Sequence, residues 1–402
     1  METVTSSAST RLTGLDGLRG IAALVVVFYH VSLVARPFLS PAEWSLLTQT
    51  PLKIFTAGTE SVLVFFVLSG LVVTLPALRD GFGWLGYYGG RMLRLYLPVW
   101  ASLALAALAV ALLPRDLASV TPDSWLARGN AFVLSWPQLL QEGSLWKASY
   151  DVNNVLWSLR WELVFSLSLP LFVIVARALR RHWVFAAALA TVATVTGRLV
   201  DVDALVYLPV FFLGALMAVR LPELRSAVGA WPRIGRVALG VASGALLIAS
   251  WLGRPIEGTI GADVLWGLAG VGAAGLVVVA VGSPTAERAL SSPVPRWLGT
   301  ISFSLYLVQA PLIGTIAFAL GDAHWKLIAA LAIPGSLLLG WLFHLAVEKP
   351  THRLAKLVGR KLGQSSRTES TLPAGSLNQQ ITGPHSGLSG REMPRESVKS
   401  PS

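Results

Sequence analysis

Long apolar runs separated by short polar connections occupy most of the chain. A membrane-spanning helix needs about 20 predominantly apolar residues, and ten runs in the sequence approach this length. They cover residues 17–35, 59–77, 95–113, 154–176, 183–199, 204–220, 235–252, 263–281, 300–319 and 327–347. The pattern predicts an all-α integral membrane protein with about ten transmembrane helices in one bundle.

The chain divides into three parts by composition. Residues 1–14 form a short segment ahead of the first apolar run, and residues 15–352 hold all ten runs. Residues 353–402 form a basic tail. Its part from 361 to 402 is rich in Ser, Gly, Pro and Arg, and a segment with so few apolar residues cannot bury enough surface to fold. We therefore expect a disordered tail, and we expect any chemistry to come from the membrane domain and its loops.

Charge is scarce in this sequence. Charged residues make up 13% of the chain, whereas soluble domains contain about 25%. A charged side chain at the centre of a bilayer costs about 2.5–3.5 kcal/mol on insertion scales, so the depletion indicates lipid surroundings. The net charge of +11 comes from basic residues that lie between the apolar runs and are frequent in the tail. This distribution favours contact with a lipid bilayer over binding of nucleic acid.

The basic residues also predict an orientation. Arginine is more frequent in the connections that follow even-numbered runs, and the positive-inside rule then places both termini in the cytoplasm. The first run, Ile21–Val34, has no signal-peptidase site after it, so we expect a retained first helix in a multi-pass protein of the cell membrane. The chain has no cysteine, which excludes disulfides, zinc thiolates and thiol nucleophiles, and we expect no metal.

Two ionisable residues stand in the first apolar run. Arg19 and His30 are eleven residues apart, close to three helical turns, so they lie near one face about 16 Å apart along the axis. An ionisable residue inside a span is a functional candidate, and histidine can take and return a proton near neutral pH. The alternative is a structural histidine that is merely hydrogen-bonded near the outer interface.

Arginines and a carboxylate mark the next candidates. Arg91 and Arg94 precede the third run, where they either anchor the helix on the cytoplasmic side or bind the phosphates of an anionic donor. Glu162 lies in the fourth run close to Arg160. This carboxylate forms either a structural ion pair or part of a site, because an unpaired charge in a span is costly.

A polar stripe runs along the ninth apolar run. Ser302, Tyr306 and Gln309 share a helical face at spacings of four and three residues. Such stripes often serve only as contacts between membrane helices. Taken alone, the stripe does not distinguish a binding surface from a packing surface.

The order of these motifs is more specific than any one of them. The chain contains Leu-Asp-Gly-Leu-Arg-Gly-Ile-Ala from Leu15, then His30, Phe-Phe-x-Leu-Ser-Gly at 65–70, Arg-x-x-Arg at 91–94, Leu-Trp-Ser-Leu-x-x-Glu at 156–162, Ser-Phe-x-x-Tyr-Leu at 302–307 and Glu-x-Pro at 348–350. Over residues 12–352 this set resembles the membrane acyltransferase-3 family. The resemblance implies ten spanning helices, acyl-CoA as donor, and O-acylation of sugars on polysaccharides, lipid-linked glycans, peptidoglycan or macrolides.

The resemblance also implies roles for single residues. It implies catalytic roles for His30, Arg19 and Glu162, and donor-binding roles for Arg91, Arg94, Ser302 and Tyr306. The chain departs from the family pattern twice. Gln309 stands where many members have histidine, and Leu63 stands where many have an acidic or polar residue, for which Glu60 is a possible substitute.

The expected function is therefore membrane-embedded O-acyl transfer, with acetyl-CoA as the expected co-substrate and a carbohydrate-containing acceptor. One alternative is a proton-coupled secondary transporter with His30 and Glu162 as relay groups, although the hydropathy shows no inverted repeat. The other alternative is a non-catalytic scaffold of glycan assembly, if Gln309 marks lost activity.

Overall fold

In the computed structural model, the described residues are 13–129, 134–146, 150–254 and 258–370, with side chains described up to Gly363, and they contain helices but no strand. The α-helices are α1 (Thr13–Ala35), α2 (Pro41–Thr48), α3 (Gly58–Ala77), α4 (Trp84–Leu112), α5 (Trp125–Gly129), α6 (Trp136–Ser144), α7 (Leu156–Leu167), α8 (Leu169–Ala178), α9 (Trp183–Leu199), α10 (Asp203–Val219), α11 (Leu221–Ala230), α12 (Arg233–Leu247), α13 (Ala249–Leu252), α14 (Ile260–Gly282), α15 (Pro284–Leu290), α16 (Pro293–Leu320), α17 (Trp325–Phe343) and α18 (Lys349–Ser370). Short helical turns are η1 (Arg36–Phe38), η2 (Pro51–Thr56), η3 (Leu117–Ser119), η4 (Arg180–His182), η6 (Asp322–His324) and the π-helical η7 (His344–Glu348).

Helices occupy all ten predicted ranges, which confirms the all-α membrane class. By length and hydropathy, the described residues contain six helices able to cross a membrane, or up to eight if two bent pairs each count as one span. The bent pairs are α7 with α8, at 65°, and α10 with α11, at 80°. Helices α9, with 17 residues, and α12, with 15, are short for a bilayer that takes about 20. Ten spans in one bundle therefore stays a prediction.

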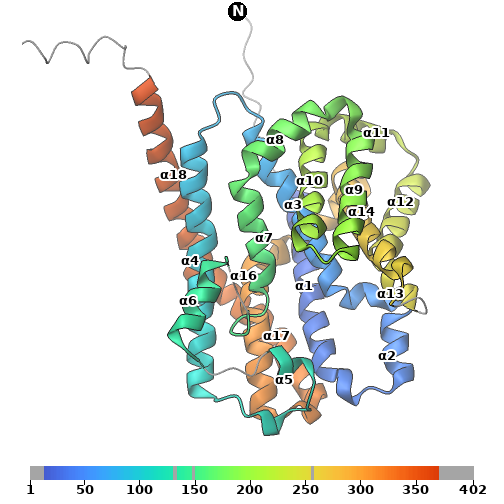
Figure 1. The fold of residues 1–402 in the computed structure, drawn as a ribbon, viewed down its shortest axis with the longest axis vertical. Coiled ribbons are helices and arrows are strands. Elements are labelled where there is room, and N and C mark those ends of the chain that lie inside the picture. The colour runs from blue at the N-terminus through green and yellow to red at the C-terminus, as the bar shows by residue number, and fades with distance from the viewer. Residues whose placement is uncertain (1–12, 130–133, 147–149, 255–257, 371–402) are drawn as a thin grey trace, which may run out of the picture.

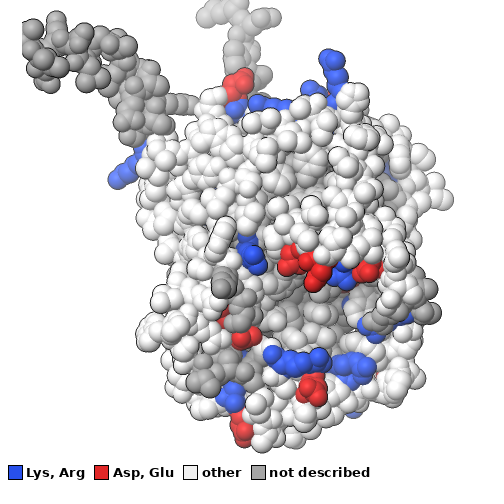
Figure 2. All heavy atoms as spheres, viewed as in Figure 1, with Lys and Arg blue, Asp and Glu red and all other residues white. Residues whose placement is uncertain are grey.

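The outer surface is apolar over large areas. Ile174, Phe185, Val192, Ile234 and Leu338 are each more than half exposed. In Figure 2 most of the visible face is uncharged, while charged atoms gather at the upper edge and in two rows around a hollow in the lower half. A protein in water rarely exposes an apolar surface of this extent, so these faces are suited to lipid.

Helix α1 lies at the centre of the molecule, against α3, α14, α16 and α17 (Figure 1). Its closest neighbour is α16, and the two run in the same direction, because Thr13 bonds Ser291 near one end and His30 bonds Gln309 near the other. The backbones cross closely at two glycines. A Cβ atom added to Gly20 would lie 2.3 Å from the backbone nitrogen of Gly299. Small residues at such a crossing let membrane helices approach, and this crossing sets which residue of α16 faces His30.

An aromatic cluster ties α3, α7 and α10 together beside α1. Phe211 of α10 stacks on Phe66 of α3, with ring centroids 4.4 Å apart, and on Phe165 of α7, at 4.6 Å. Phe165 and Phe211 are completely buried. Stacked rings of this kind contribute about 0.5–1.5 kcal/mol beyond the area that they bury, so α7 is held firmly against the centre of the bundle.

Helix α18 corrects the expectation for the tail. The sequence predicts disorder from residue 353, yet α18 continues to Ser370 and lies along α4 in Figure 1. A Cβ atom added to Gly86 of α4 would lie 2.4 Å from the carbonyl oxygen of Gly359. The expectation is wrong up to Ser370 because glycines on both helices allow a close backbone contact, which stabilises a helix that composition alone does not favour. The rest of the tail lies outside the described residues.

Candidate active site

His30 is buried in the centre of the bundle and has a fixed orientation. Its side chain is 6% exposed, and its Nδ1 atom lies 3.0 Å from Oε1 of Gln309. The indole of Trp125 stacks on one face of the ring, with centroids 5.1 Å apart and planes at 29°. A carbonyl oxygen only accepts hydrogen bonds, so the contact with Oε1 of Gln309 favours the tautomer that carries its proton on Nδ1, and the side chain of Asn154 also bonds the ring. This tautomer is the one that a general base needs.

Gln309 has an unused donor beside His30. The residue is completely buried, and its Nε2 atom has no hydrogen-bond partner among the described residues. A buried donor left without a partner costs about 1–3 kcal/mol, and a group of this kind often has a functional reason. In the sequence, Gln309 is a departure from the family pattern, because many members have histidine at this position. The structure shows that this residue contacts His30 directly.

Three arginines gather toward the other end of α1, and they differ in how they are bonded. Arg91 donates to Glu162 at 2.5 Å and to the hydroxyl of Ser166 at 3.2 Å, which joins α4 to α7. Arg94 lies in the electrostatic field of Arg91 and Arg19. Neither Arg94 nor Arg19 forms a hydrogen bond or ion pair with another described residue. Arg94 and Arg19 are therefore the guanidiniums available to an anion.

Glu162 has a different partner from the one next to it in sequence. Its carboxylate pairs with Arg91 of α4, whereas Arg160 stacks over the ring of Trp161 at 5.1 Å. An ion pair between helices holds both charges away from lipid, which a neighbour on the same helix cannot do as well. A catalytic role of Glu162 stays a prediction, and its contacts are those of a residue that positions Arg91.

The hydroxyls of Ser302 and Tyr306 are already bonded inside the bundle. Tyr306 lies 2.7 Å from the hydroxyl of Ser158 and donates to the carbonyl of Val155 at 3.1 Å. Ser302 donates to the carbonyl of Gly299 in its own helix at 2.9 Å. The contacts of Tyr306 fix α16 against the start of α7, whereas the bond of Ser302 stays within α16. The role of the two residues in donor binding stays a prediction.

Glu348, from the Glu-x-Pro motif, is the centre of a buried polar cluster. Its carboxylate accepts from Ser304 at 2.5 Å and lies 3.0 Å from His344 and 3.7 Å from His352. Glu348 ends the π-helical segment η7, and such segments are frequent at functional sites. The cluster joins α16 to the junction of α17 and α18, close to Arg94.

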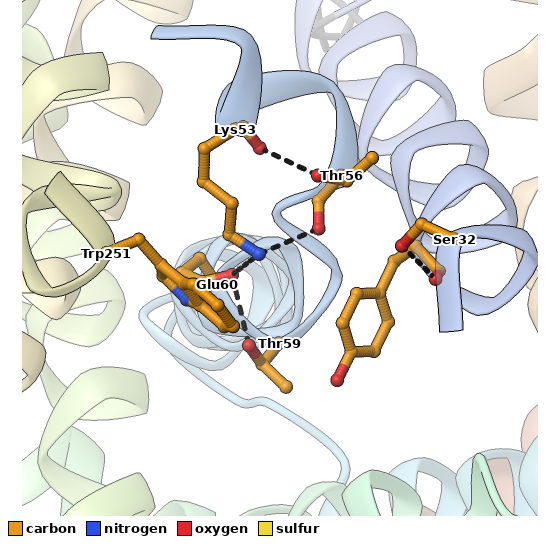
Figure 3. Close-up of polar contacts among 7 residues, drawn as sticks. Ser32, Lys53, Thr56, Thr59, Glu60 and Trp251 are labelled. Carbon is orange, nitrogen blue, oxygen red and sulfur yellow. Dashed lines mark hydrogen bonds and ion pairs between the residues drawn. The ribbon is translucent and has the colours of Figure 1, made fainter. Parts of the chain in front are cut away.

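A buried lysine near His30 was missed by sequence reasoning. Figure 3 shows Lys53 of η2 beside Glu60 of α3, and the two side chains are 2% and 0% exposed. Lys53 Nζ donates to the carbonyl of Thr56 at 3.0 Å, lies 4.0 Å from Glu60, and sits 3.8 Å from the ring centre of Trp251. Burial lowers the pKa of the Lys53 ammonium, and the nearby Glu60 charge opposes that shift. In sequence, Lys53 lies in a polar connection and resembles a solvent-exposed residue.

A cavity of about 550 Å³ lies next to His30, at the Ala35 end of α1. Tyr29 and Trp125, whose rings both contact His30, form part of its wall. The remaining lining residues are Leu33, Arg36, Pro37, Thr121, Pro122, Asp123, Ser124, Arg128 and Gly129. The described residues contain no group of three or more His, Cys, Asp or Glu side chains able to hold a metal ion.

Comparison with known proteins bears on this site. The profile of the acyltransferase-3 family, described as an acyltransferase domain, matches residues 12–345. The chain is similar to Acyltransferase MdmB of Streptomyces mycarofaciens, at 28% identity over 388 residues that cover 86% of this chain and 92% of that protein. No solved structure matches significantly. The matched region includes His30, Gln309 and the three arginines.

Proposed function

The chain belongs to the acyltransferase-3 family and is an acyltransferase, and we propose that it moves an acyl group from acyl-CoA to a hydroxyl of a carbohydrate or glycosylated acceptor. Acetyl is the group that we propose first. The observation that carries the proposal is the His30–Gln309 pair, which holds a buried imidazole in the tautomer of a general base. The proposed localisation is the cell membrane, with both termini in the cytoplasm.

The donor site that we propose lies around Arg94 and Arg19. At neutral pH the 3′-phosphate of acyl-CoA is nearly dianionic and each phosphate of its pyrophosphate bridge carries one negative charge, and guanidinium groups match phosphate oxygens in geometry. Both guanidiniums lack a described partner, whereas Arg91 is held by Glu162. We assign Arg91 to positioning the segment that carries Arg94. The thioester then extends along α1 toward His30.

The proposed chemistry is a direct transfer. Nε2 of His30 takes the proton of the acceptor hydroxyl while the oxygen attacks the thioester carbonyl. A carbon–oxygen bond forms, the carbon–sulfur bond breaks, and the imidazolium returns the proton to the departing thiolate. Nε2 of Gln309, which has no described partner, is a suitable donor for the oxyanion that develops on the carbonyl oxygen.

Acyl transfer by the purified protein tests the proposal. Protein in lipid nanodiscs is mixed with radiolabelled acetyl-CoA and a panel of glycosides, and the products are separated and identified. The expected result is an O-acetyl ester on the sugar and release of one CoA thiol for each ester. If CoA is released at the same rate with and without each glycoside and no sugar ester forms, the result would contradict transfer to a carbohydrate.

The orientation of the protein in the membrane can be tested by thiol labelling, because the chain has no cysteine of its own. Asp123→Cys and Arg288→Cys place single thiols near opposite ends of α1, at exposed positions. In intact cells, a membrane-impermeant maleimide should label the thiol at 123 and leave the thiol at 288 unlabelled. The reverse pattern would show that the termini lie outside.

A further inference from the structure

The cavity beside His30 has walls that are held in place by defined contacts. The backbone N–H of Thr121 donates to the buried carboxylate of Asp322 at 2.7 Å, and Ser124 accepts from the N–H of Ala127 at 3.2 Å. These bonds tie the segment 121–129 to the start of η6 and to itself. A volume of about 550 Å³ is within the range of about 300–1,000 Å³ that small-molecule sites occupy.

The charge of the cavity wall is uneven. Arg36 and Arg128 line it, against one carboxylate, Asp123. Neither guanidinium forms a salt bridge with any carboxylate in the part of the chain that the structure describes. Arg36 is held in position by the ring of Trp44, at 4.8 Å from the guanidinium carbon. Two guanidiniums without carboxylate partners, one of them held by an aromatic ring, form a site for an oxyanion, since this group accepts bidentate hydrogen bonds from arginine.

Aromatic rings form the wall nearest His30. Tyr29 and Trp125 line the cavity, and the ring of Trp125 stacks on one face of the His30 imidazole. Lys53 supports Tyr29 from behind, at 5.5 Å from the ring centre. Flat rings that combine an apolar face with a polar edge suit a sugar ring, which is itself apolar on one face and hydroxylated at its edges.

We propose that this cavity is the acceptor site and that it selects carbohydrates carrying an anionic group, a carboxylate or a phosphate. Arg36 and Arg128 bind the anion, Tyr29 and Trp125 hold the sugar ring, and the hydroxyl to be acylated faces His30. This inference rests on the proposed function. The same oxyanion chemistry is present in a phospholipid headgroup, so the experiment separates the two sources.

Binding without donor tests the site directly. The protein is placed in nanodiscs of zwitterionic lipid, and equilibrium dialysis measures Kd for radiolabelled methyl glucoside, methyl glucuronide and glucose 6-phosphate. At least one charged sugar should bind about tenfold or more tightly than the neutral glucoside, a difference of about 1.4 kcal/mol. The double substitution Arg36→Gln and Arg128→Gln should remove this preference and leave weak binding of the neutral sugar.

Lys326→Gln is the matched control, because it removes one exposed positive charge near the same end of the molecule and does not line the cavity. The control should keep the preference. Equal binding of all three sugars by the wild type would overturn the proposal, as would a preference that survives the double substitution. If the double substitution instead lowers only the amount of anionic phospholipid that copurifies, the arginines bind headgroups and the acceptor proposal is wrong.

The outcomes separate this inference from the proposed function. If a charged sugar binds in an arginine-dependent way but no sugar is acylated, the result would support the binding site and contradict the proposed function. Acyl transfer to neutral glycosides alone, unaffected by the double substitution, would keep the function and reject the selectivity.

Discussion

The two ends of α1 carry polar groups in opposite states. Near the Thr13 end of α1, Arg19 and Arg94 lack described partners and face each other's charge. Toward the other end, His30 is bonded to Gln309 and stacked on Trp125, and the nearby Lys53 and Glu60 are completely enclosed. The first arrangement is open to an incoming anion, and in the second each group is held by defined contacts.

The difference indicates that one end of α1 docks the donor and the other end holds the catalytic base. A docking site for a charged donor has to leave its cations unsatisfied until the ligand arrives. A catalytic base has to be held in one tautomer and one orientation before the substrate arrives, because its contribution depends on geometry. If the division is real, substitutions at the two ends should change different measured quantities.

The largest effect is expected at His30. His30→Ala removes the general base, which typically contributes 10²–10⁴-fold, so kcat for acyl transfer should fall by about that factor. The protein should remain folded, as judged by its thermal unfolding in detergent. His324→Gln is the control, since among the described residues this exposed histidine bonds only to the carbonyl of Leu320 in the preceding helix. A His30→Ala protein with near-normal kcat would make His30 a structural residue.

The enclosed ion pair should have the next largest effect, on stability. Lys53→Met leaves the Glu60 carboxylate buried without its cation, and breaking a buried pair in this way costs about 3–5 kcal/mol. The melting temperature should fall clearly. Combining Lys53→Met with Glu60→Gln should recover much of the loss, because no uncompensated charge remains. A double variant that is less stable than Lys53→Met would show that the pair is not the source of the effect.

A substitution at Gln309 distinguishes two roles of this residue, which are orientation of the His30 imidazole and stabilisation of the oxyanion. Gln309→Glu keeps an oxygen that accepts from Nδ1 of His30 but loses the N–H donor. If the donor acts on the oxyanion, kcat should fall by about 10²-fold with little change in the KM for acyl-CoA. If Gln309 only orients the imidazole, Gln309→Glu should retain its kcat, with a pH profile shifted upward by the added negative charge.

The smallest effects are expected at the open end. Arg94→Ala should weaken binding of acyl-CoA by about tenfold, because one charge-assisted contact is lost, with little change in stability. Arg91→Ala should lower stability as well, since it leaves Glu162 without its partner. Arg288→Ala, which removes an exposed guanidinium from α15, is the control for both. Identical effects of the two substitutions would contradict the distinction between a free and a bonded arginine.

The helical class and the positions of the helices could be read from the sequence because hydropathy dictates them. The contact partners of the site residues could not be predicted from the sequence. Gln309 faces His30 because α1 and α16 cross at Gly20 and Gly299, and no local pattern fixes that register. Arg160 is nearer to Glu162 in sequence, yet Arg91 reaches it from another helix. Lys53 was missed because its burial depends on Trp251, about two hundred residues away.

The most direct test measures the Kd of acyl-CoA and the turnover number together in four proteins: wild type, Arg94→Ala, His30→Gln and the double variant. His30→Gln should bind acyl-CoA as the wild type does and have no turnover, since glutamine cannot relay a proton at neutral pH. Arg94→Ala should bind about tenfold more weakly, and the double variant should bind as Arg94→Ala does. Donor binding that weakens in His30→Gln as much as in Arg94→Ala would contradict the separation of docking from chemistry.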